Sequence, residues 1–308
     1  MEVYTDGSCI VGPDNERYGG AGIWFGPDDM RNTRVTIPSH LSTNQYAELL
    51  AIKYALTLCR NTKVLTVKTD SKYSINCVTL WCKAWEKNDW KTSGNKDVMH
   101  SSVIKDCLRI LEYRETLGYS TSFIHVKAHS GILGNEGADT LAGLASSESC
   151  KRAMENTIFF SGGVLSQFYT SKFVSSSEDG GIEYTHAEQW HQHQKAILFG
   201  DYECAQRVLD YALPWDQKTA GTHPKNFDRT IWNEKGFEIA VKGSYYKYTQ
   251  NPSLGRYLLS TKGKRLVEAR EDNVWGIGVN ISAAKSGAKW NGLNLLGKAL
   301  MKVRDEML

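Results

Sequence analysis

The chain has 308 residues, of which 41% are hydrophobic and 23% charged, and its formal net charge is +3. This length suits two domains of roughly 150 residues each, and the composition indicates a folded protein. A net charge this small does not by itself indicate a nucleic-acid binder. Seven cysteines, an odd number without a C-x-x-C pair, predict reduced thiols and an intracellular protein, cytoplasmic or nuclear.

No apolar run approaches the roughly 18 residues of a membrane span. The first residues, MEVYTD, lack the apolar core of a signal peptide. We therefore expect no membrane partner, and the sequence leaves the oligomeric state open.

The first half of the chain alternates strands with helices. Strands are expected at residues 2–5, 20–25, 33–37, 64–69 and 121–126, and helices around Glu48, from Ser71 to about Trp85, and at 135–145. The helix around Glu48 is indicated by apolar positions that recur at i, i+3 and i+4, namely Ala47, Leu50, Ala51, Tyr54, Ala55 and Leu58. This order of elements predicts an α/β fold, a mixed sheet with helical cover.

Four acidic residues fall on four different elements of this half. Asp6 lies on the first strand, Glu48 near the start of its helix, Asp70 at the end of a parallel strand, and Asp139 in the last helix. Ligands in open α/β sheets bind beyond the carboxyl ends of the strands, so these acids can converge. Close carboxylates repel one another unless cations lie between them, and two Mg²⁺ ions about 4 Å apart can activate water in phosphodiester cleavage. The pattern predicts metal-dependent phosphoryl chemistry.

Four ordered motifs in residues 1–148 resemble those of cellular ribonuclease H, type 1. They are YTDGS (4–8), TNQYAE (43–48), KTDS (68–71) and HSGILGNEGAD (129–139). The resemblance implies hydrolysis of the RNA strand of an RNA·DNA hybrid. It also implies roles: Asp6, Glu48, Asp70 and Asp139 as ligands of Mg²⁺ or Mn²⁺, Asn44 and Gln45 as RNA contacts, and His129 in proton transfer or product release.

Residues 81–93 interleave lysines with tryptophans. Cations that neutralise phosphates beside indole rings suit a groove for the DNA strand, and the segment resembles the basic handle of the same family. Trp85 and Lys87 are the candidate contacts. Alternatively, Trp81 and Trp85, four residues apart, only pack two helices together.

A polar stretch at residues 149–156 is the expected linker between domains at 1–148 and 157–308, although Ala153 and Met154 could let the preceding helix continue. The second domain reads as mainly α within an α+β fold. Strands are expected at 157–161, 168–174 and 181–184, and helices at 185–198, 201–211, 227–249 and 290–307. Thr185 to Glu188 has the pattern of a capping box.

Three motifs of the second half together resemble the NADAR family of riboflavin-biosynthesis-type N-glycosidases. They are HAEQWHQHQKA (186–196), WGIG (275–278) and WNGLNLLGKALM (290–301). The resemblance covers about residues 157–308. It implies cleavage of N-glycosidic bonds at ribose without a cofactor, and one branch of the family removes ADP-ribose from guanine bases of nucleic acid.

Glu188 and Lys195 fit the chemistry of N-ribosyl cleavage. A carboxylate can stabilise the oxocarbenium-like transition state, and an amine can donate a proton or capture the ring-opened aldehyde as an imine. Glu188 could instead only cap its helix, and Lys195 could be a surface cation. Candidate substrate contacts are an aromatic lid and the residues near it: Trp275, Gly276, Gly278 and Asn294.

Three functions compete for the whole chain. The first is a bifunctional enzyme that cleaves RNA·DNA hybrids and removes ADP-ribose from nucleic acid. The second makes the C-terminal domain a metabolic N-glycosidase on ribosylated riboflavin intermediates, and the third makes it a non-catalytic ADP-ribose-binding module. A basic surface would favour the first, and its expected members are Lys242, Lys247, Arg256, Lys262, Lys264 and Arg265.

Overall fold

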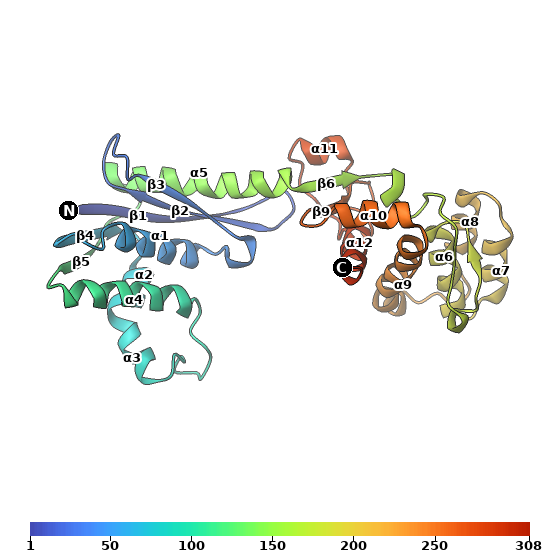
Figure 1. Cartoon of the computed structure of the whole chain (residues 1–308), viewed down its shortest axis with the longest axis horizontal. Coiled ribbons are helices and arrows are strands. Elements are labelled where there is room, and N and C mark those ends of the chain that lie inside the picture. The colour runs from blue at the N-terminus through green and yellow to red at the C-terminus, as the bar shows by residue number, and fades with distance from the viewer. The chain divides into compact units, whose positions relative to one another are not determined.

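The computed structural model describes all 308 residues, which divide into two compact units, Met1–Glu155 and Asn156–Leu308 (Figure 1). We describe each unit by itself. In neither unit is any helix both long enough and apolar enough to cross a bilayer.

The first unit is built on a five-stranded sheet with the strand order β3-β2-β1-β4-β5. The strands are β1 (Glu2–Val11), β2 (Arg17–Trp24), β3 (Thr33–Ile37), β4 (Val64–Thr69) and β5 (Ser120–His125). The first three are antiparallel neighbours, and β4 and β5 run parallel to β1. The predicted mixed sheet is therefore confirmed, although β1 and β2 are longer than expected.

Helices cover both faces of this sheet (Figure 1). They are α1 (Asn44–Leu58), α2 (Lys72–Asn76), a π-helical turn (Cys77–Trp81), α3 (Cys82–Lys87), α4 (Ser101–Thr116) and α5 (Leu133–Glu155). Helix α5 packs on β1, β2 and β3, and α1 packs on β1 and against α4. Helix α4 was not predicted from the sequence. Only a narrow stripe of this helix is apolar, and its buried positions include the charged Arg114.

Helix α1 is buried more broadly than its predicted stripe. Leu49, Ile52 and Leu56 are in the core, whereas Tyr54 and Leu58, expected to be buried, are exposed. The helix begins after Thr43, whose side chain accepts a hydrogen bond from the Tyr46 amide. Glu48 thus lies on the first turns, above the sheet.

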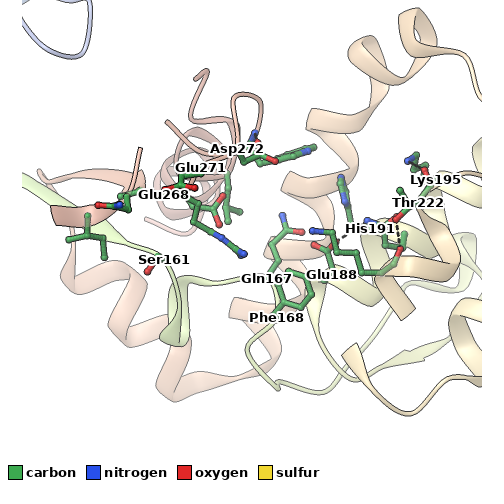
Figure 2. A pocket seen from close by; sticks show the side chains of 18 of the residues that line it. Ser161, Gln167, Phe168, Glu188, His191, Lys195, Thr222, Glu268, Glu271 and Asp272 are labelled. Carbon is green, nitrogen blue, oxygen red and sulfur yellow. Dashed lines mark hydrogen bonds between the residues drawn. The ribbon is translucent and has the colours of Figure 1, made fainter. Parts of the chain in front are cut away.

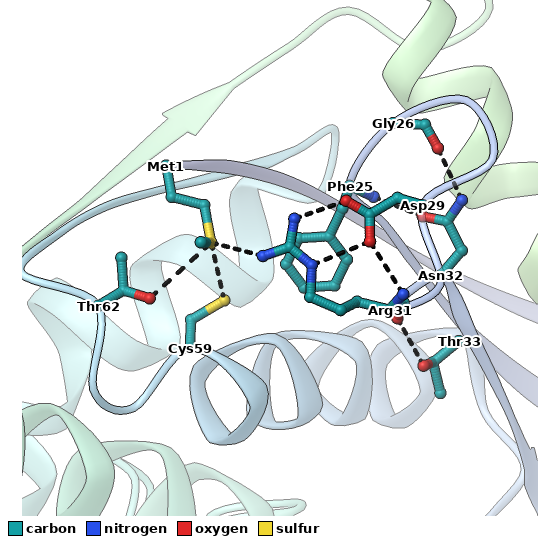
Figure 3. A network of polar contacts seen from close by, with 9 residues as sticks. All are labelled: Met1, Phe25, Gly26, Asp29, Arg31, Asn32, Thr33, Cys59 and Thr62. Atoms are coloured by element: carbon teal, nitrogen blue, oxygen red, sulfur yellow. Dashed lines mark hydrogen bonds and ion pairs between the residues drawn. The ribbon is translucent and has the colours of Figure 1, made fainter.

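A small polar network anchors the start of β1 (Figure 3). The Arg31 guanidinium pairs with Asp29, lies 4.4 Å from the Phe25 ring centroid, and donates to the Met1 sulfur. The Met1 sulfur also accepts contacts from Cys59 and Thr62. The first residue is therefore held against the β2–β3 turn and the end of α1.

The expected linker at residues 149–156 is helical in the structure almost to its end. Helix α5 runs through Glu155, and a strand begins at Thr157. Ala153 and Met154 continue the helix, which was the open alternative. Small residues such as Ala142, Ala145 and Ser146 let the middle of α5 lie close to the sheet.

The second unit is mainly helical and has two short sheets. Strands β6 (Thr157–Phe160) and β9 (Arg265–Glu268) are parallel, and β7 (Phe173–Val174) and β8 (Glu183–Tyr184) are antiparallel. The helices are α6 (Ala187–Leu198), α7 (Tyr202–Asp210), α8 (Pro214–Gly221), α9 (Arg229–Gln250), α10 (Pro252–Ser260), α11 (Ile281–Lys285) and α12 (Leu295–Glu306). A core of Leu258, Leu266, Leu300 and Val303 joins β9 to α10 and α12.

Several elements of this unit differ from the sequence predictions. Helices α8, α10 and α11 and strand β9 were not predicted. The expected strand at 168–174 is reduced to two residues, and the helix expected from Trp290 begins only at Leu295. Asn294 precedes that helix with a φ of 53°, a left-handed conformation that ends the preceding loop.

Candidate active sites

The first candidate site lies where the parallel pairing of β1 and β4 ends. Tyr4 pairs with Lys68, so Asp6, within β1, and Asp70, just after β4, are each two residues beyond the last pair of these two strands. Glu48 joins them from α1: one ligand atom from each of the three residues lies within 4.8 Å of the others. The structure therefore brings together three of the four predicted acids.

A glycine makes this approach of helix and strand possible. A Cβ atom on Gly7 would lie only 2.2 Å from the Glu48 amide nitrogen, so any other residue would push α1 away from β1. On the opposite face a Cβ atom on Gly22 would lie 2.1 Å from the Ala138 carbonyl oxygen. Gly22 thereby lets α5 approach the sheet beside Asp139.

Burial and mutual repulsion raise the pKa values of this cluster. Burial, then the charge of Asp70, raises the pKa of Asp6 to about 7, although the Gly7 amide donates to its carboxylate. Burial and the charges of Asp6 and Asp70 also raise the pKa of Glu48, and its Oε2 atom has no hydrogen-bond partner. No lysine or arginine offsets these effects, so the donor set fits a divalent cation.

The other predicted nuclease residues lie around this cluster. Asp139 is exposed on α5, and its charge contributes to raising the pKa of Asp6, but it is not one of the three close carboxylates. Asn44 and Gln45 are exposed at the start of α1, and His129 is exposed in the β5–α5 loop. Asn135 was not predicted, and it donates to the Asp70 carboxylate at 3.1 Å.

In the aromatic segment 81–90, Trp85 packs inside the protein, as the alternative to nucleic-acid contact predicted. The half-buried Trp85 ring lies 5.9 Å from the Trp81 centroid and 6.3 Å from that of Trp90, and it packs against the core. Trp81 keeps 39% of its surface exposed, and Lys87 is exposed at the end of α3. The exposed members remain candidates for nucleic-acid contact.

The second candidate site is a cavity of about 780 Å³ in the second unit. It lies beyond the carboxyl ends of β6 and β9, where Ser161 and Arg270 line it, and one face of α6 supplies Glu188, His191 and Lys195. Figure 2 shows these three side chains on one side of the cavity and Glu268, Glu271 and Asp272 on the other. The motif residues of α6 therefore converge on one enclosed site.

Glu188 does not cap its helix, so the predicted capping box is wrong by one residue. His186 is the N-cap and accepts from the Gln189 amide at 3.1 Å, and Gln189 Oε1 accepts from the Thr185 amide at 2.8 Å. The Glu188 carboxylate instead accepts from Gln192 Nε2 at 2.9 Å inside the cavity. Its pKa is raised by burial, while the Gln192 hydrogen bond and nearby cations oppose that shift.

Lys195 is buried in the cavity wall, which excludes a surface role. Its Nζ donates to the Thr222 carbonyl oxygen at 2.6 Å and lies 4.7 Å from the Phe227 ring centroid and 5.3 Å from that of Trp232. Burial lowers its pKa. A lysine with a lowered pKa has a larger share of the neutral, nucleophilic amine.

His191 lies between Glu188 and Lys195 and was not predicted as a site residue. Only 4% of it is exposed, and its ring packs 4.7 Å from Trp275 and 5.0 Å from Trp232. Neither ring nitrogen has a hydrogen-bond partner of good geometry, although the Gly236 backbone lies close enough to favour the protonated ring slightly. Burial and the charge of Lys195 lower the pKa of His191 to about 3, so the imidazole is neutral at physiological pH.

Of the four candidate substrate contacts around the predicted aromatic lid, only Trp275 lines the cavity. Its amide and that of Val274 are held by the Asp272 carboxylate. Gly276, Gly278 and Asn294 are not part of the lining. A Cβ atom on Gly278 would lie 1.6 Å from the Asn291 side chain.

Asn294 instead supports the wall of the cavity from behind. Its side chain accepts from the Glu268 amide at 2.9 Å and donates to the Leu266 carbonyl oxygen at 3.0 Å. It thereby fixes the end of β9, where Glu268, the last residue of the strand, lines the cavity.

Three further lining residues were missed because their elements were missed. Glu268 ends β9, Arg270 follows it, and Lys218 lies on α8. Burial raises the pKa of Glu268 to about 7, while the charges of Arg270 and Lys218 oppose that shift. The apolar pair Leu266 and Val267 before Glu268 was the one local signal that could have indicated a buried strand here.

The basic surface expected in the second unit is formed only in part. Lys247 is 1% exposed and donates to the carbonyl oxygens of Val164 and Ser166, both at 2.8 Å. Lys242 pairs with Asp179. Arg256, Lys262 and Lys264 are exposed, so the expected surface lacks Lys247 and has Lys242 paired with an acid.

Comparisons with known proteins match the two units to two different families. The family model for RNase H matches residues 1–147, and that for the NADAR domain matches residues 158–308. An N-glycosidase of Acanthamoeba polyphaga mimivirus is 41% identical over 127 residues, 40% of this chain and 75% of the relative. Ribonuclease HI of Vibrio parahaemolyticus is 34% identical, over 46% of this chain and 86% of the relative.

Ribonuclease H1 of Homo sapiens is 39% identical over 46% of this chain, and the chain spans about half, 48%, of that relative's length. The chain therefore belongs to the ribonuclease H family in its first unit and to the NADAR family in its second. Both assignments are to hydrolases, so the protein combines a nuclease domain with an N-glycosidase-family domain.

Proposed function

We propose that the first unit hydrolyses the RNA strand of RNA·DNA hybrids with Mg²⁺, or Mn²⁺ in its place. The proposal is supported chiefly by three carboxylates that lie within 4.8 Å of one another, with no lysine or arginine among the main groups that shift the pKa values of Asp6 and Glu48. Asp6, Glu48 and Asp70 would hold the metal, with Asp139 at the edge of the cluster. When bound, the metal activates water and stabilises the leaving oxygen.

The protein's own residues orient the reacting groups in this proposal. Asn135 holds the Asp70 carboxylate, and the Gly7 amide holds that of Asp6. Asn44 and Gln45, exposed at the start of α1, would bind the RNA strand, and His129 would transfer a proton. The test is cleavage of a labelled RNA·DNA hybrid with and without Mg²⁺, with a DNA duplex and single-stranded RNA as controls.

We propose that the second unit hydrolyses an N-ribosyl bond and removes ADP-ribose from guanine bases. The observation that carries this proposal is that Glu188 and Lys195 line one cavity. Glu188 does not cap its helix, and Lys195 is not a surface residue. The bond between ribose C1′ and the base nitrogen breaks, and its electron pair leaves with the base. Glu188 stabilises the positive charge on the ribose, as a fixed carboxylate can.

Water then completes the reaction at C1′. Its oxygen bonds to C1′, and its proton passes to the departing base nitrogen, so the products are ADP-ribose and the unmodified guanine, which stays in its nucleotide. Lys195 either positions the substrate or forms an imine with the ring-opened aldehyde, which water later hydrolyses. Lys195→Arg separates these roles, because arginine keeps the charge and does not form an imine.

The direct test is incubation with an ADP-ribosylated guanine oligonucleotide and measurement of released ADP-ribose. An active Lys195→Arg enzyme would exclude covalent capture. Trapping of the wild-type enzyme by borohydride during turnover would support it.

A ribosylated small molecule, such as a riboflavin intermediate, is the second candidate substrate. It is favoured by the burial of Lys247 and the pairing of Lys242, which weaken the expected basic surface for nucleic acid. Comparing an ADP-ribosylated guanosine nucleotide, the modified oligonucleotide and a ribosylated riboflavin intermediate distinguishes the candidates. Equal turnover of nucleotide and oligonucleotide would mean that the enzyme makes no use of the strand.

A further inference from the structure

A second hollow of about 760 Å³ adjoins the cavity that contains Glu188. The two share Ser161, Phe168 and Arg270 as lining residues, so we describe them as the first and second lobes of one cleft. The second lobe is further lined by Gly162, Gly163, Ser166, Tyr169, Thr170 and Trp215. No residue assigned to the reaction above lines this lobe.

Two cations lie at the junction of the lobes. Arg270 lines both, and Lys218 lines the first, with its Nζ 5.4 Å from the Phe168 ring centroid and 5.3 Å from that of Trp215. Their charges oppose the rise in the pKa values of Glu188 and Glu268, so they act on the acids of the first lobe. A positive junction between lobes suits an anionic group such as a phosphate.

Beyond this junction the wall of the second lobe is aromatic. Trp215 is 63% exposed and Tyr169 is 39% exposed, and the Trp215 ring lies 6.4 Å from that of Phe168. An indole left open to a hollow offers a flat face to another ring. Stacking of a nucleobase on such a side chain contributes about 1–3 kcal/mol.

We infer that the second lobe binds the terminal nucleobase of a nucleoside-diphosphate ribosyl group. The diphosphate lies at Lys218 and Arg270, and the reacting ribose lies beside Glu188. The order acid, cations, aromatic wall along the cleft matches the order ribose, diphosphate, base along such a molecule. This inference rests on the proposed N-ribosyl hydrolysis and specifies which end of the substrate each lobe holds.

The test compares two probes, of which only one carries the adenosine assigned to the second lobe. ADP-ribose carries the diphosphate and the adenosine, whereas ribose 5-phosphate ends at the junction. Affinities of both for the full chain are measured by competition calorimetry. Trp215→Ala should weaken ADP-ribose about tenfold, the equivalent of 1.4 kcal/mol, and leave ribose 5-phosphate unchanged.

Two further variants control the experiment. Arg270→Gln should weaken both probes, because both place a phosphate at the junction. Tyr202→Ala removes an aromatic residue that is 71% exposed on α7 and lines neither lobe, so it should weaken neither probe.

Each contrary result has a distinct meaning. If Trp215→Ala leaves ADP-ribose binding unchanged but weakens an ADP-ribosylated oligonucleotide, the second lobe holds the nucleic-acid strand and the inference is wrong. If wild type binds ADP-ribose no better than ribose 5-phosphate, the second lobe takes no part and the inference is wrong. If wild type binds neither probe and releases no ADP-ribose, the proposed function itself fails.

Discussion

The two candidate sites hold buried carboxyl groups in opposite electrostatic surroundings. In the nuclease site Asp6, Glu48 and Asp70 lie against one another, and no cationic side chain opposes the resulting rise in pKa. In the glycosidase cavity the charges of Lys218, Arg270 and Lys195 oppose the rise in the pKa of Glu188. Both sites nevertheless lie near the ends of parallel strands, β1 with β4 and β6 with β9.

This difference separates a site that needs an added cation from one that does not. Repulsion among close carboxylates is relieved when a divalent ion binds between them. In the cavity the chain's own lysine and arginine side chains oppose the rise in the pKa values of the buried Glu188 and Glu268. We therefore expect metal ions, charge-removing substitutions and pH to affect the two units differently.

The largest effect is expected from Asp70→Asn in the nuclease site. Removing one carboxylate should lower Mg²⁺-dependent hybrid cleavage by roughly 10²–10³-fold or more, because an electrostatic partner of the reaction is lost. Release of ADP-ribose by the second unit should not change. Both reactions are measured on the same preparation, and undiminished cleavage would contradict the metal assignment.

Glu188→Gln should lower N-ribosyl hydrolysis by roughly 10²-fold without lowering the melting temperature. The amide keeps the shape of the side chain but loses the charge, and it is Gln189, not Glu188, that completes the helix cap. Gln189→Ala is the matched control. It should destabilise the unit by about 1–3 kcal/mol while the purified folded enzyme stays active.

If Glu188→Gln keeps full activity, the central carboxylate is removed from the proposed mechanism. If it unfolds, the carboxylate is structural instead.

His191→Phe should lower N-ribosyl hydrolysis about tenfold, the value of one lost hydrogen bond to the substrate. It should also raise the melting temperature of the second unit by about 2–4 °C, because two buried nitrogens without partners are replaced by carbon. An imidazole without a hydrogen-bond partner in a substrate cavity is expected to lower the stability of the fold while it strengthens substrate binding.

His193→Phe is the control for this change on the same helix. His193 is also 4% exposed, but its Nδ1 pairs with the Tyr184 hydroxyl at 2.9 Å. Its replacement should lower the melting temperature. If both variants are destabilised alike, His191 is a packing residue and not a substrate contact.

The smallest effect is expected from Mg²⁺, which should raise the melting temperature of the first unit by a few degrees. This increase should be larger at pH 8 than at pH 5. The pKa of Asp6 is raised from 3.8 to about 7, so the folded state holds a proton that the unfolded state releases. Stability without metal therefore falls as pH rises through this range. A divalent ion reverses the loss where the carboxyl groups are ionised.

Calorimetry of the full chain with and without Mg²⁺ measures this effect. The transition of the second unit should not respond to Mg²⁺ at either pH. An equal shift at pH 5 and pH 8, or a shift in the second unit alone, would contradict the comparison.

The sequence by itself determined the acids of the first site and the strands that carry them. Alternating strands and helices predicted the mixed sheet, and the parallel order of the strands of Asp6 and Asp70 predicted that these acids would converge. Glu188 and Lys195 are seven residues apart, two turns of α6, which places them on one face because helical spacing is a local property.

Only the tertiary structure decided which charges are free, paired or buried. Lys247 looked like a surface cation and is in the core, whereas Lys218 and Arg270 come from elements that the sequence did not predict. Short elements such as α8 and β9 are stabilised mainly by packing, so local propensity does not reveal them. The cavity is assembled from their ends, and its electrostatics could therefore not be predicted from any single stretch of sequence.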